Sequence, residues 1–341
     1  VATHGRSFWI LDDITPLRVV VDEGASLELI MPRTTIRQNI HWSAGIFNGD
    51  GKDYSPAFGV PGTSYLSELK DGTKERKYLD TGENPPLGAI IYYWLNDNNV
   101  GKPVKISIKD GSGATIATCD SGNDKESEKR KPTSYLGLNR FVWDLTENGP
   151  TSLDDSLKVK KYEPFSKEGG GPAGAKVKPG KYQVVVDIGG QNKNCELEVI
   201  SDPRISVTDE DFAEQHDLYG SVVAKLSELN IAVNRVRLMK QQLKNMHKIM
   251  PEENKRIEEL IASLDNVEGS LIDTKRETPR DVLRHEAGLD DTLINLLWVI
   301  KIADSKPPLQ TKEVTEDVFG QVDSILSKLE SLIKNEITDF N

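Results

Sequence analysis

The side chains best suited to chemistry include two adjacent carboxylates near the start of the chain. Asp12 and Asp13 close an apolar stretch, Phe8-Trp9-Ile10-Leu11, whose residue types predict a β-strand. Acid–base cleavage of a glycoside needs two carboxylates that face one another. Neighbouring residues of a strand point to opposite sides, so this pair is poorly arranged for that reaction. We interpret His4, Arg6, Asp12 and Asp13 as a strand end and its turn.

The histidines do not follow the spacing of a metal centre. A di-iron site in a helical bundle needs a Glu-x-x-His pair on each of two helices. His216, His247 and His285 occur without one, because Glu214 lies two residues before His216 rather than three. We predict that the three histidines are surface residues.

Two loop-like sequences resemble ligand sites only superficially. Asn48-Gly49-Asp50-Gly51-Lys52-Asp53 offers oxygen atoms at short spacing, but Gly59 stands where an EF-hand needs its glutamate. Gly169-Gly170-Gly171 lacks the Gly-Lys-Ser/Thr ending of a phosphate-binding loop. We therefore predict a turn at the first sequence and a loop at the second.

Three consecutive aromatic residues invite comparison with a sugar-stacking surface. Tyr92, Tyr93 and Trp94 follow Ile90 and Ile91 in a stretch that is apolar at both parities. Alternate residues of a strand point to opposite faces, so the three rings cannot share one face. The stretch therefore predicts a central strand whose aromatics pack in a core.

Two cysteines do not make a disulfide framework. Cys195 shares the inward parity of Leu197 and Val199, whereas Cys119 has the opposite parity to Ile116, which we take as the core residue of its strand. Regular strands need not bring the two thiols together, and a disulfide between them is left open.

Composition limits the classes of partner. The chain has 341 residues and a formal net charge of −11, which argues against nucleic acid and anionic membranes as general partners. No apolar run reaches the ~20 residues of a membrane span. The first residue is Val1, without an initiator Met or a signal sequence, and we expect a fragment or a processed product.

The elements that would position these residues fall into two groups. Period-two alternation predicts strands at residues 27–31, 104–109, 137–145, 182–188 and 195–199, and residues 115–119 are predicted to return from the turn after 104–109. The stretch 84–95, apolar at both parities, predicts a further strand. Apolar residues spaced by three and four predict four helices after residue 208, with a capping box at Thr208 and Asp211 and an N1 proline at Pro251. Residues 43–85, 120–134 and 146–176 are predicted to be long loops.

Several of these stretches resemble a known family. Thr3-His4-Gly5-Arg6-Ser7-Phe8-Trp9-Ile10-Leu11-Asp12-Asp13-Ile14-Thr15-Pro16-Leu17 resembles the last strand of a BNR-repeat, sortilin-like β-propeller of the bacterial proteins often labelled glycosyl hydrolases. Lys105 to Gly113, Gly137 to Asp144 and Lys178 to Tyr182 resemble the FlgD-type immunoglobulin-like sheet that follows that propeller. The chain contains no Asp-box repeat, so the propeller itself is missing.

The resemblance and the periodicity together imply an architecture. We expect an Ig-like, FlgD-type β-sandwich followed by an antiparallel all-α four-helix bundle. Residues 1–17 would be the remnant of a propeller strand, 18–200 the sandwich and 201–341 the bundle. Phe8 to Leu11 would lack their blade, and an unpaired apolar strand would either fold back on the sandwich or pair with another chain.

The resemblance also implies a function class. We expect a non-catalytic structural or interaction module, the C-terminal part of a BNR-repeat propeller protein, located extracellularly or in the periplasm. One alternative is an accessory carbohydrate-binding part of a secreted, sialidase- or xyloglucanase-like glycoside hydrolase. Another is an adaptor that binds a protein partner through the bundle. The expected partners are the missing propeller or another protein chain and, in the first alternative, carbohydrate. We assign no catalytic, cofactor-binding or metal-binding residue and expect no cofactor.

Overall fold

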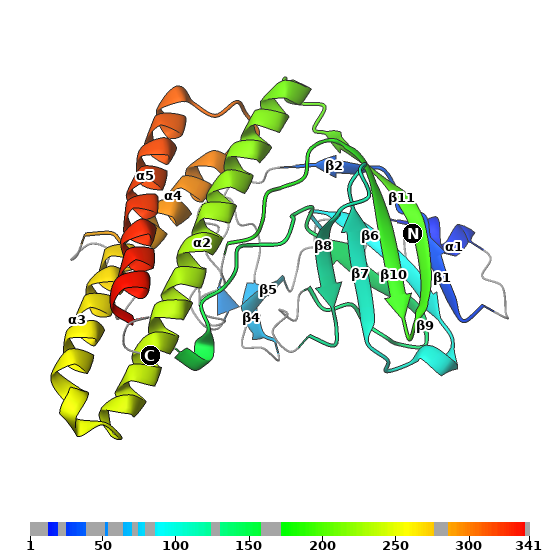
Figure 1. The fold of residues 1–341 in the computed structure, drawn as a ribbon. Helices are drawn as coiled ribbons and strands as arrows, with labels where there is room; N and C mark the ends of the chain where they lie inside the picture. The colour runs from blue at the N-terminus through cyan, green and yellow to red at the C-terminus, as the bar shows by residue number, and fades with distance from the viewer. Residues whose placement is uncertain are drawn as a thin grey trace. The chain divides into compact units, whose positions relative to one another are not determined.

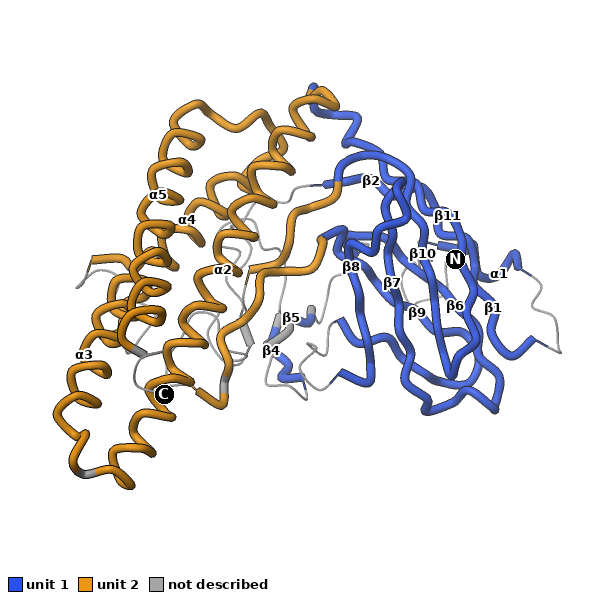
Figure 2. Tube along the Cα trace, viewed as in Figure 1, with its two compact units in different colours: residues 1–146, 178–206 blue, residues 147–177, 207–341 orange. Residues whose placement is uncertain are grey.

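The computed structural model describes residues 13–19, 25–38, 52–53, 64–69, 74–78, 86–123, 130–157, 172–275 and 286–337. The chain divides into two compact units (Figures 1 and 2). The strand unit contains residues 1–146 and 178–206, and the helical unit contains residues 147–177 and 207–341. The chain thus leaves the strand unit, contributes a segment to the helical unit, and returns.

Two sheets carry the core of the strand unit. The three-stranded sheet has the order β1 (Leu27–Ile30), β6 (Ala89–Leu95), β9 (Gly137–Trp143) and is antiparallel. The five-stranded sheet has the order β2 (Thr35–Arg37), β11 (Gln191–Ser201), β10 (Gly180–Ile188), β7 (Val104–Lys109), β8 (Thr115–Asp120). β2 runs parallel to β11, whereas the other pairs are antiparallel.

Alternation decides which side chains are buried. In β6, Ala89, Ile91, Tyr93 and Leu95 are buried and the residues between them are half-buried. The alternation of β7, β9 and β10 follows the same rule. Gly189 and Gly190 both adopt positive φ angles, of 58° and 82°, in the two-residue turn between β10 and β11. A type I′ hairpin turn requires such angles, which explains the Gly-Gly sequence.

A third sheet is built from β3 (Lys52–Asp53), β4 (Ser64–Glu68) and β5 (Lys74–Tyr78). These strands lie in residues 43–85, where the sequence led us to expect a loop. Lys74-Glu75-Arg76-Lys77-Tyr78 has one apolar residue, so hydropathy gave no strand signal. Main-chain pairing, with Tyr65 opposite Lys77, defines the strands instead.

The helical unit is built on one long helix. α2 (Asp209–His247) begins at Thr208, whose side chain accepts a hydrogen bond from the main-chain N–H of Asp211. The Asp211 carboxylate in turn accepts one from the N–H of Thr208, as the sequence predicted. α3 (Asn254–Leu271) follows a 3₁₀ turn at Pro251–Glu253, and α4 (Leu289–Lys301) and α5 (Leu309–Leu332) complete the unit, with a π-helical turn at Ile333–Ile337. Residues spaced by three and four on α2 form one buried cluster with residues from α3, α4 and α5.

The expected β-sandwich followed by a four-helix bundle is wrong. Within the described residues the strands form three sheets, of which the largest is mixed. Five α-helices are present there, and the first, α1 (Thr15–Arg18), precedes every strand. Residues 147–177 belong with the helices although they lie between β9 and β10. Periodicity indicates which side chains are buried, but not which strands pair or where the chain between two strands packs.

Candidate functional site

One face of α2 binds main-chain atoms of another segment. Ser227 Oγ accepts a hydrogen bond from the N–H of Thr151 at 3.1 Å, and Asn230 Nδ2 donates to the Thr151 carbonyl at 2.7 Å. Asn234 donates to the carbonyl of Ser152 at 3.1 Å and accepts from the N–H of Asp154 at 2.8 Å. Ser227, Asn230 and Asn234 are spaced by three and four residues, so they lie on one helix face. We call these three residues the α2 polar face.

The two ends of the segment that the α2 polar face binds, residues 147–149 and 172–175, lie next to each other. The N–H of Glu147 donates to the carbonyl of Ala175 at 2.8 Å, so residues 147–149 and 172–175 lie side by side. A Cβ atom on Gly174 would come within 2.3 Å of the Asn148 carbonyl oxygen, which only glycine avoids. Leu153 and Ala175 join the apolar cluster of the helices. Apolar burial and main-chain hydrogen bonds thus hold the segment together.

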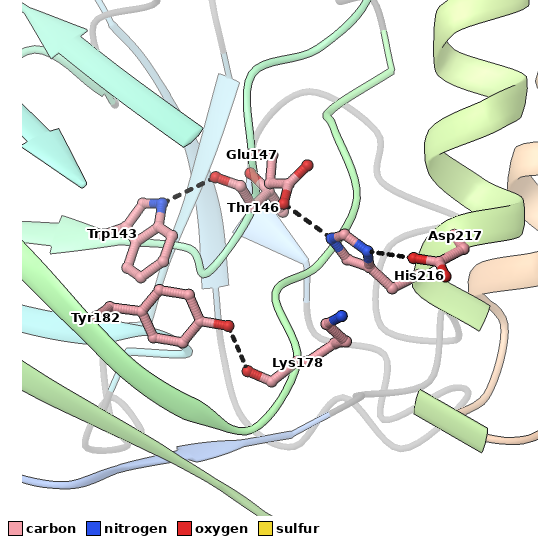
Figure 3. A network of polar contacts seen from close by, with 7 residues as sticks. All are labelled: Trp143, Thr146, Glu147, Lys178, Tyr182, His216 and Asp217. Atoms are coloured by element: carbon pink, nitrogen blue, oxygen red, sulfur yellow. Dashed lines mark hydrogen bonds and ion pairs between the residues drawn. The ribbon is translucent and has the colours of Figure 1, made fainter. Parts of the chain in front are cut away.

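His216 and Tyr219 extend these contacts toward the start of α2. His216 Nε2 lies 2.8 Å from Glu147 Oε1, and Nδ1 lies 3.3 Å from Asp217 Oδ1 (Figure 3). The Tyr219 hydroxyl donates to the Ala173 carbonyl at 3.0 Å, and burial raises the pKa of that phenol to about 12. With 20% of its side chain exposed, His216 is not the surface residue we predicted. A carboxylate at each ring nitrogen fixes the orientation of the imidazole.

A buried ion cluster joins α2 to α3. Arg237 Nε donates to Glu268 Oε1 at 2.7 Å, and both side chains are 3% exposed. Lys240 Nζ binds Glu268 Oε2 at 2.8 Å and also contacts Asp265. Lys240 is the residue that interrupts the apolar spacing of α2, and the ion cluster explains the interruption. These charges are paired between two helices, as buried charges must be.

Two asparagines of α2 are a sequence signal for these contacts that our prediction did not use. Asparagine is a poor residue for a helix interior, yet Asn230 and Asn234 stand beside the apolar stripe of α2. Such residues at helical spacing indicate a polar partner. The identity of that partner depends on a segment some 80 residues earlier, which one sequence does not reveal.

The remaining candidates near the chain start lie partly outside the described residues. His4, Arg6 and Asp12 belong to that part, whereas Asp13 is described. Asp13 Oδ1 accepts a hydrogen bond from the Thr15 N–H at 2.9 Å. Partial burial raises the pKa of Asp13, but this hydrogen bond and the charges of Arg33 and Arg140 bring it below its ordinary value. The carboxylate therefore has a local structural contact at the start of α1.

The described residues contain no group of three or more His, Cys, Asp or Glu side chains suited to a metal ion. His247 is half-buried at the end of α2. His285, Gly169 to Gly171 and Asn48 to Gly51 lie outside the described residues, while Lys52 and Asp53 form β3.

Both cysteines are free thiols. Cys119 is 3% exposed and Ile116 is only half-buried, so our choice of Ile116 as the core residue of β8 was wrong. Cys195 lies on β11, and β10 and β7 separate it from β8. With strands ~4.8 Å apart, the thiols sit about 14 Å apart across the sheet, beyond disulfide reach. Burial raises the pKa of Cys195 to about 11, which keeps it protonated.

The three aromatics of β6 divide between two faces. Tyr93 is fully buried, and its hydroxyl donates to the Thr133 carbonyl. Tyr92 and Trp94 are half-buried and share the opposite face of the strand. β6 is the central strand of its sheet, as predicted. The prediction of core packing is therefore right for Tyr93 and incomplete for the other two.

The helical unit also exposes apolar side chains. Trp298, Val299 and Ile302, at the end of α4, are each nearly half exposed, and Lys301 Nζ lies 5.4 Å from the centre of the Trp298 ring. Shallow hollows lie along α5 and between α3 and α5. None of the described helices has both the length and the apolar content needed to cross a membrane.

Comparison with family models, with curated proteins and with solved structures found no match to this chain. Function must therefore be argued from the contacts themselves.

Proposed function

We propose that this chain is a non-catalytic structural module that holds an extended segment on a long helix. The observation that supports this most is the α2 polar face. Its side chains bind N–H and C=O groups of Thr151, Ser152 and Asp154 rather than an open pocket. The His216–Glu147 and Arg237–Glu268 contacts join elements of the same unit in a similar way.

Following the sequence resemblance, the module would accompany a BNR-type propeller in an extracellular or periplasmic protein. Support for this comes from the motif at Thr3 to Leu17, most of which lies outside the described residues. The propeller, or another protein chain, is the partner that this proposal implies.

The support role is tested by removing the amides of Asn230 and Asn234. In Asn230→Ala/Asn234→Ala the N–H of Asp154 loses its acceptor and two carbonyls lose their donor. Each lost hydrogen bond is worth about 1 kcal/mol, so amide exchange at Asp154 should rise roughly tenfold. Asn245→Ala, at an exposed position of α2, is the matched control and should leave exchange unchanged. Unchanged exchange in the double variant would mean that other contacts hold the segment.

The non-catalytic part of the proposal has its own test. We expect the purified chain to hydrolyse neither aryl glycosides nor sialosides. Turnover that is present in the wild type and lost in Asp13→Asn would contradict the proposal and place chemistry at the chain start.

A second candidate function is an adaptor that binds a protein through the helical unit. The exposed Trp298, Val299 and Ile302 favour it, because aromatic and aliphatic side chains grouped at a surface are typical of protein contacts. A partner captured by the wild type and by Leu309→Ser, but not by Trp298→Ser/Ile302→Ser, would support this function. A partner captured equally by all three would not.

The carbohydrate-binding alternative has weaker support. Sugar stacking needs an exposed aromatic platform, and Tyr135, at 70% exposed, is the large aromatic most open to solvent in the described part of the strand unit. Trp143 and Tyr182 pair edge to face, with ring planes at 66°, and Trp143 is buried.

A further inference from the structure

An asparagine followed by a glycine lies exposed in the segment that the helical unit contains between β9 and β10. Among the described residues, Asn148–Gly149 is the one place where glycine follows asparagine. Both residues are exposed, and they belong to neither a helix nor a strand. Asparagine is one of the thermolabile residue types. The pair therefore combines a reactive side chain with access for water.

The reaction open to this pair is an attack by the Gly149 main-chain nitrogen on the side-chain amide carbon of Asn148. A carbon–nitrogen bond forms, the bond to the side-chain nitrogen breaks, and ammonia leaves with the proton of the Gly149 N–H. Water then opens the cyclic succinimide at either carbonyl, which gives aspartate or isoaspartate. Glycine favours the attack because no side chain shields its nitrogen. Within the part of the chain that the structure describes, no hydrogen bond occupies the Gly149 N–H.

Main-chain packing around the pair opposes that attack. A Cβ atom on Gly174 would come within 2.3 Å of the Asn148 carbonyl oxygen, and one on Gly149 would come within 2.5 Å of the Pro172 carbonyl oxygen. These close approaches restrict rotation about the backbone of Asn148. The attack needs such a rotation to bring the nitrogen to the side-chain carbon. Local opening of the contact therefore sets the rate of the reaction.

The isoaspartate product does not fit the same contact. Its main chain runs through the former side chain, which adds one carbon atom, and so a bond of about 1.5 Å, between positions 148 and 149. The Glu147 N–H donates to the Ala175 carbonyl at 2.8 Å, which fixes the register of the neighbouring backbone. An added atom beside this hydrogen bond displaces the carbonyl oxygen that packs on Gly174.

We propose that Asn148–Gly149 is a site of spontaneous deamidation whose rate is limited by the contact between residues 147–149 and 172–175. Conversion to isoaspartate opens that contact permanently. Water is the only co-reactant that the reaction needs, and this inference does not depend on the proposed function.

Ageing of the purified full chain at mildly alkaline pH tests the proposal. Peptide mass spectrometry, with chromatographic separation of the aspartate and isoaspartate forms, measures conversion at each asparagine. Gly174→Ala forces the contact apart and should make conversion at Asn148 several-fold faster than in the wild type. Gly220→Ala, where a Cβ meets nothing within 4 Å, is the matched control and should leave the rate unchanged. Equal rates in all three chains would overturn the proposal.

A comparison within the wild type covers the case in which Gly174→Ala does not fold. Asn245 is exposed on α2 and is followed by Met246, so it should convert several-fold more slowly than Asn148 in the same sample. Conversion at Asn148 no faster than at Asn245 would overturn the assignment of the site.

The effect of the product on the contact has its own measurement. Amide hydrogen exchange at Glu147 should become several-fold faster in the aged chain, because its N–H loses the Ala175 carbonyl. Asn148→Gln, with one more side-chain carbon, forms a cyclic imide far more slowly and should keep its exchange rate through the same ageing. Conversion at Asn148 with unchanged exchange at Glu147 would mean that the contact survives, against the proposal.

Discussion

Trp143 combines apolar burial with two specific contacts. It is 1% exposed, its indole N–H donates to the Thr146 carbonyl at 2.9 Å, and its ring meets that of Tyr182 edge to face at 6.1 Å (Figure 3). Leu145, just after the strand, is buried with a φ of 63°, so the indole hydrogen bond helps to hold a turn of unfavourable backbone angle.

We expect Trp143→Ala to lower the free energy of unfolding by ~3–5 kcal/mol, the usual cost of deleting a large buried aromatic. Denaturant unfolding followed by near-ultraviolet circular dichroism measures the loss. Tyr135→Ala removes an aromatic that is 70% exposed and should change the stability little. Equal effects of the two substitutions would contradict the assigned burial.

Glu268 neutralises Arg237 inside the helical unit. Removing one partner of a buried ion pair leaves the other charge unpaired and typically costs ~3–5 kcal/mol. Glu268→Ala should therefore unfold at much lower denaturant than Glu258→Ala, which alters an exposed position of the same helix. Arg237→Met/Glu268→Leu should be less destabilised than Glu268→Ala, since the buried charge of Arg237 is removed as well and Lys240 keeps its contact with Asp265. If the double variant were the less stable of the two, the ion pair itself would be the source of stability.

At the scale of elements, the glycines of the helical unit give predictions of opposite sign. A Cβ on Gly174 would meet the Asn148 carbonyl oxygen at 2.3 Å, whereas one on Gly220, within α2, would meet nothing within 4 Å. We expect Gly174→Ala to lower the melting temperature, because residues 147–149 and 172–175 must move apart. Gly220→Ala should raise it, because alanine is favoured over glycine in a helix by up to ~1 kcal/mol. A stabilising Gly174→Ala would show that residues 147–149 and 172–175 do not approach closely.

The same elements show how far sequence patterns reach. The three-and-four spacing of Val222, Leu226 and Leu229 predicted α2, and the Thr208–Asp211 box predicted its start. Alternation predicted β7 and β10. Strand pairing was beyond this information because it depends on distant partners, as in the parallel pair of β2 and β11. The α2 polar face was missed for the same reason, since Asn230 acquires its meaning only from Thr151.

At the scale of the whole molecule, each of the two units contains a buried tyrosine whose ionisation at alkaline pH should destabilise the fold. Burial raises the pKa of Tyr93 in the strand unit and of Tyr219 in the helical unit to about 12, although the hydrogen bond to Thr133 partly lowers that of Tyr93. An unfolded tyrosine ionises near pH ~10, so each phenol resists ionisation only while folded. The resulting stability is complete below pH ~10 and is lost as the pH rises toward 12.

We expect unfolding at alkaline pH to accompany tyrosine ionisation, with each phenol contributing up to ~2–3 kcal/mol. Absorbance at 295 nm and circular dichroism, recorded together from pH 9 to 12.5, would follow the two processes. Tyr93→Phe and Tyr219→Phe should each reduce the dependence of stability on pH in this range. Ionisation of every tyrosine near pH ~10, with no loss of structure, would contradict the burial of both hydroxyls.

The path of the chain between the units limits how this protein could be recombined with others. The backbone passes from one unit to the other at residues 146–147, 177–178 and 206–207, so no single break separates strands from helices. A gene fusion that exchanged everything after residue 206 would bring new helices to a chain that still carries Leu153 and Ala175. The new helices would have to provide a binding site for residues 147–177. The original helices, moved to another chain, would lose the segment that they bind here. To exchange the whole helical unit, both residues 147–177 and residues 207–341 must be replaced. The helical unit is therefore expected to evolve together with the strand unit.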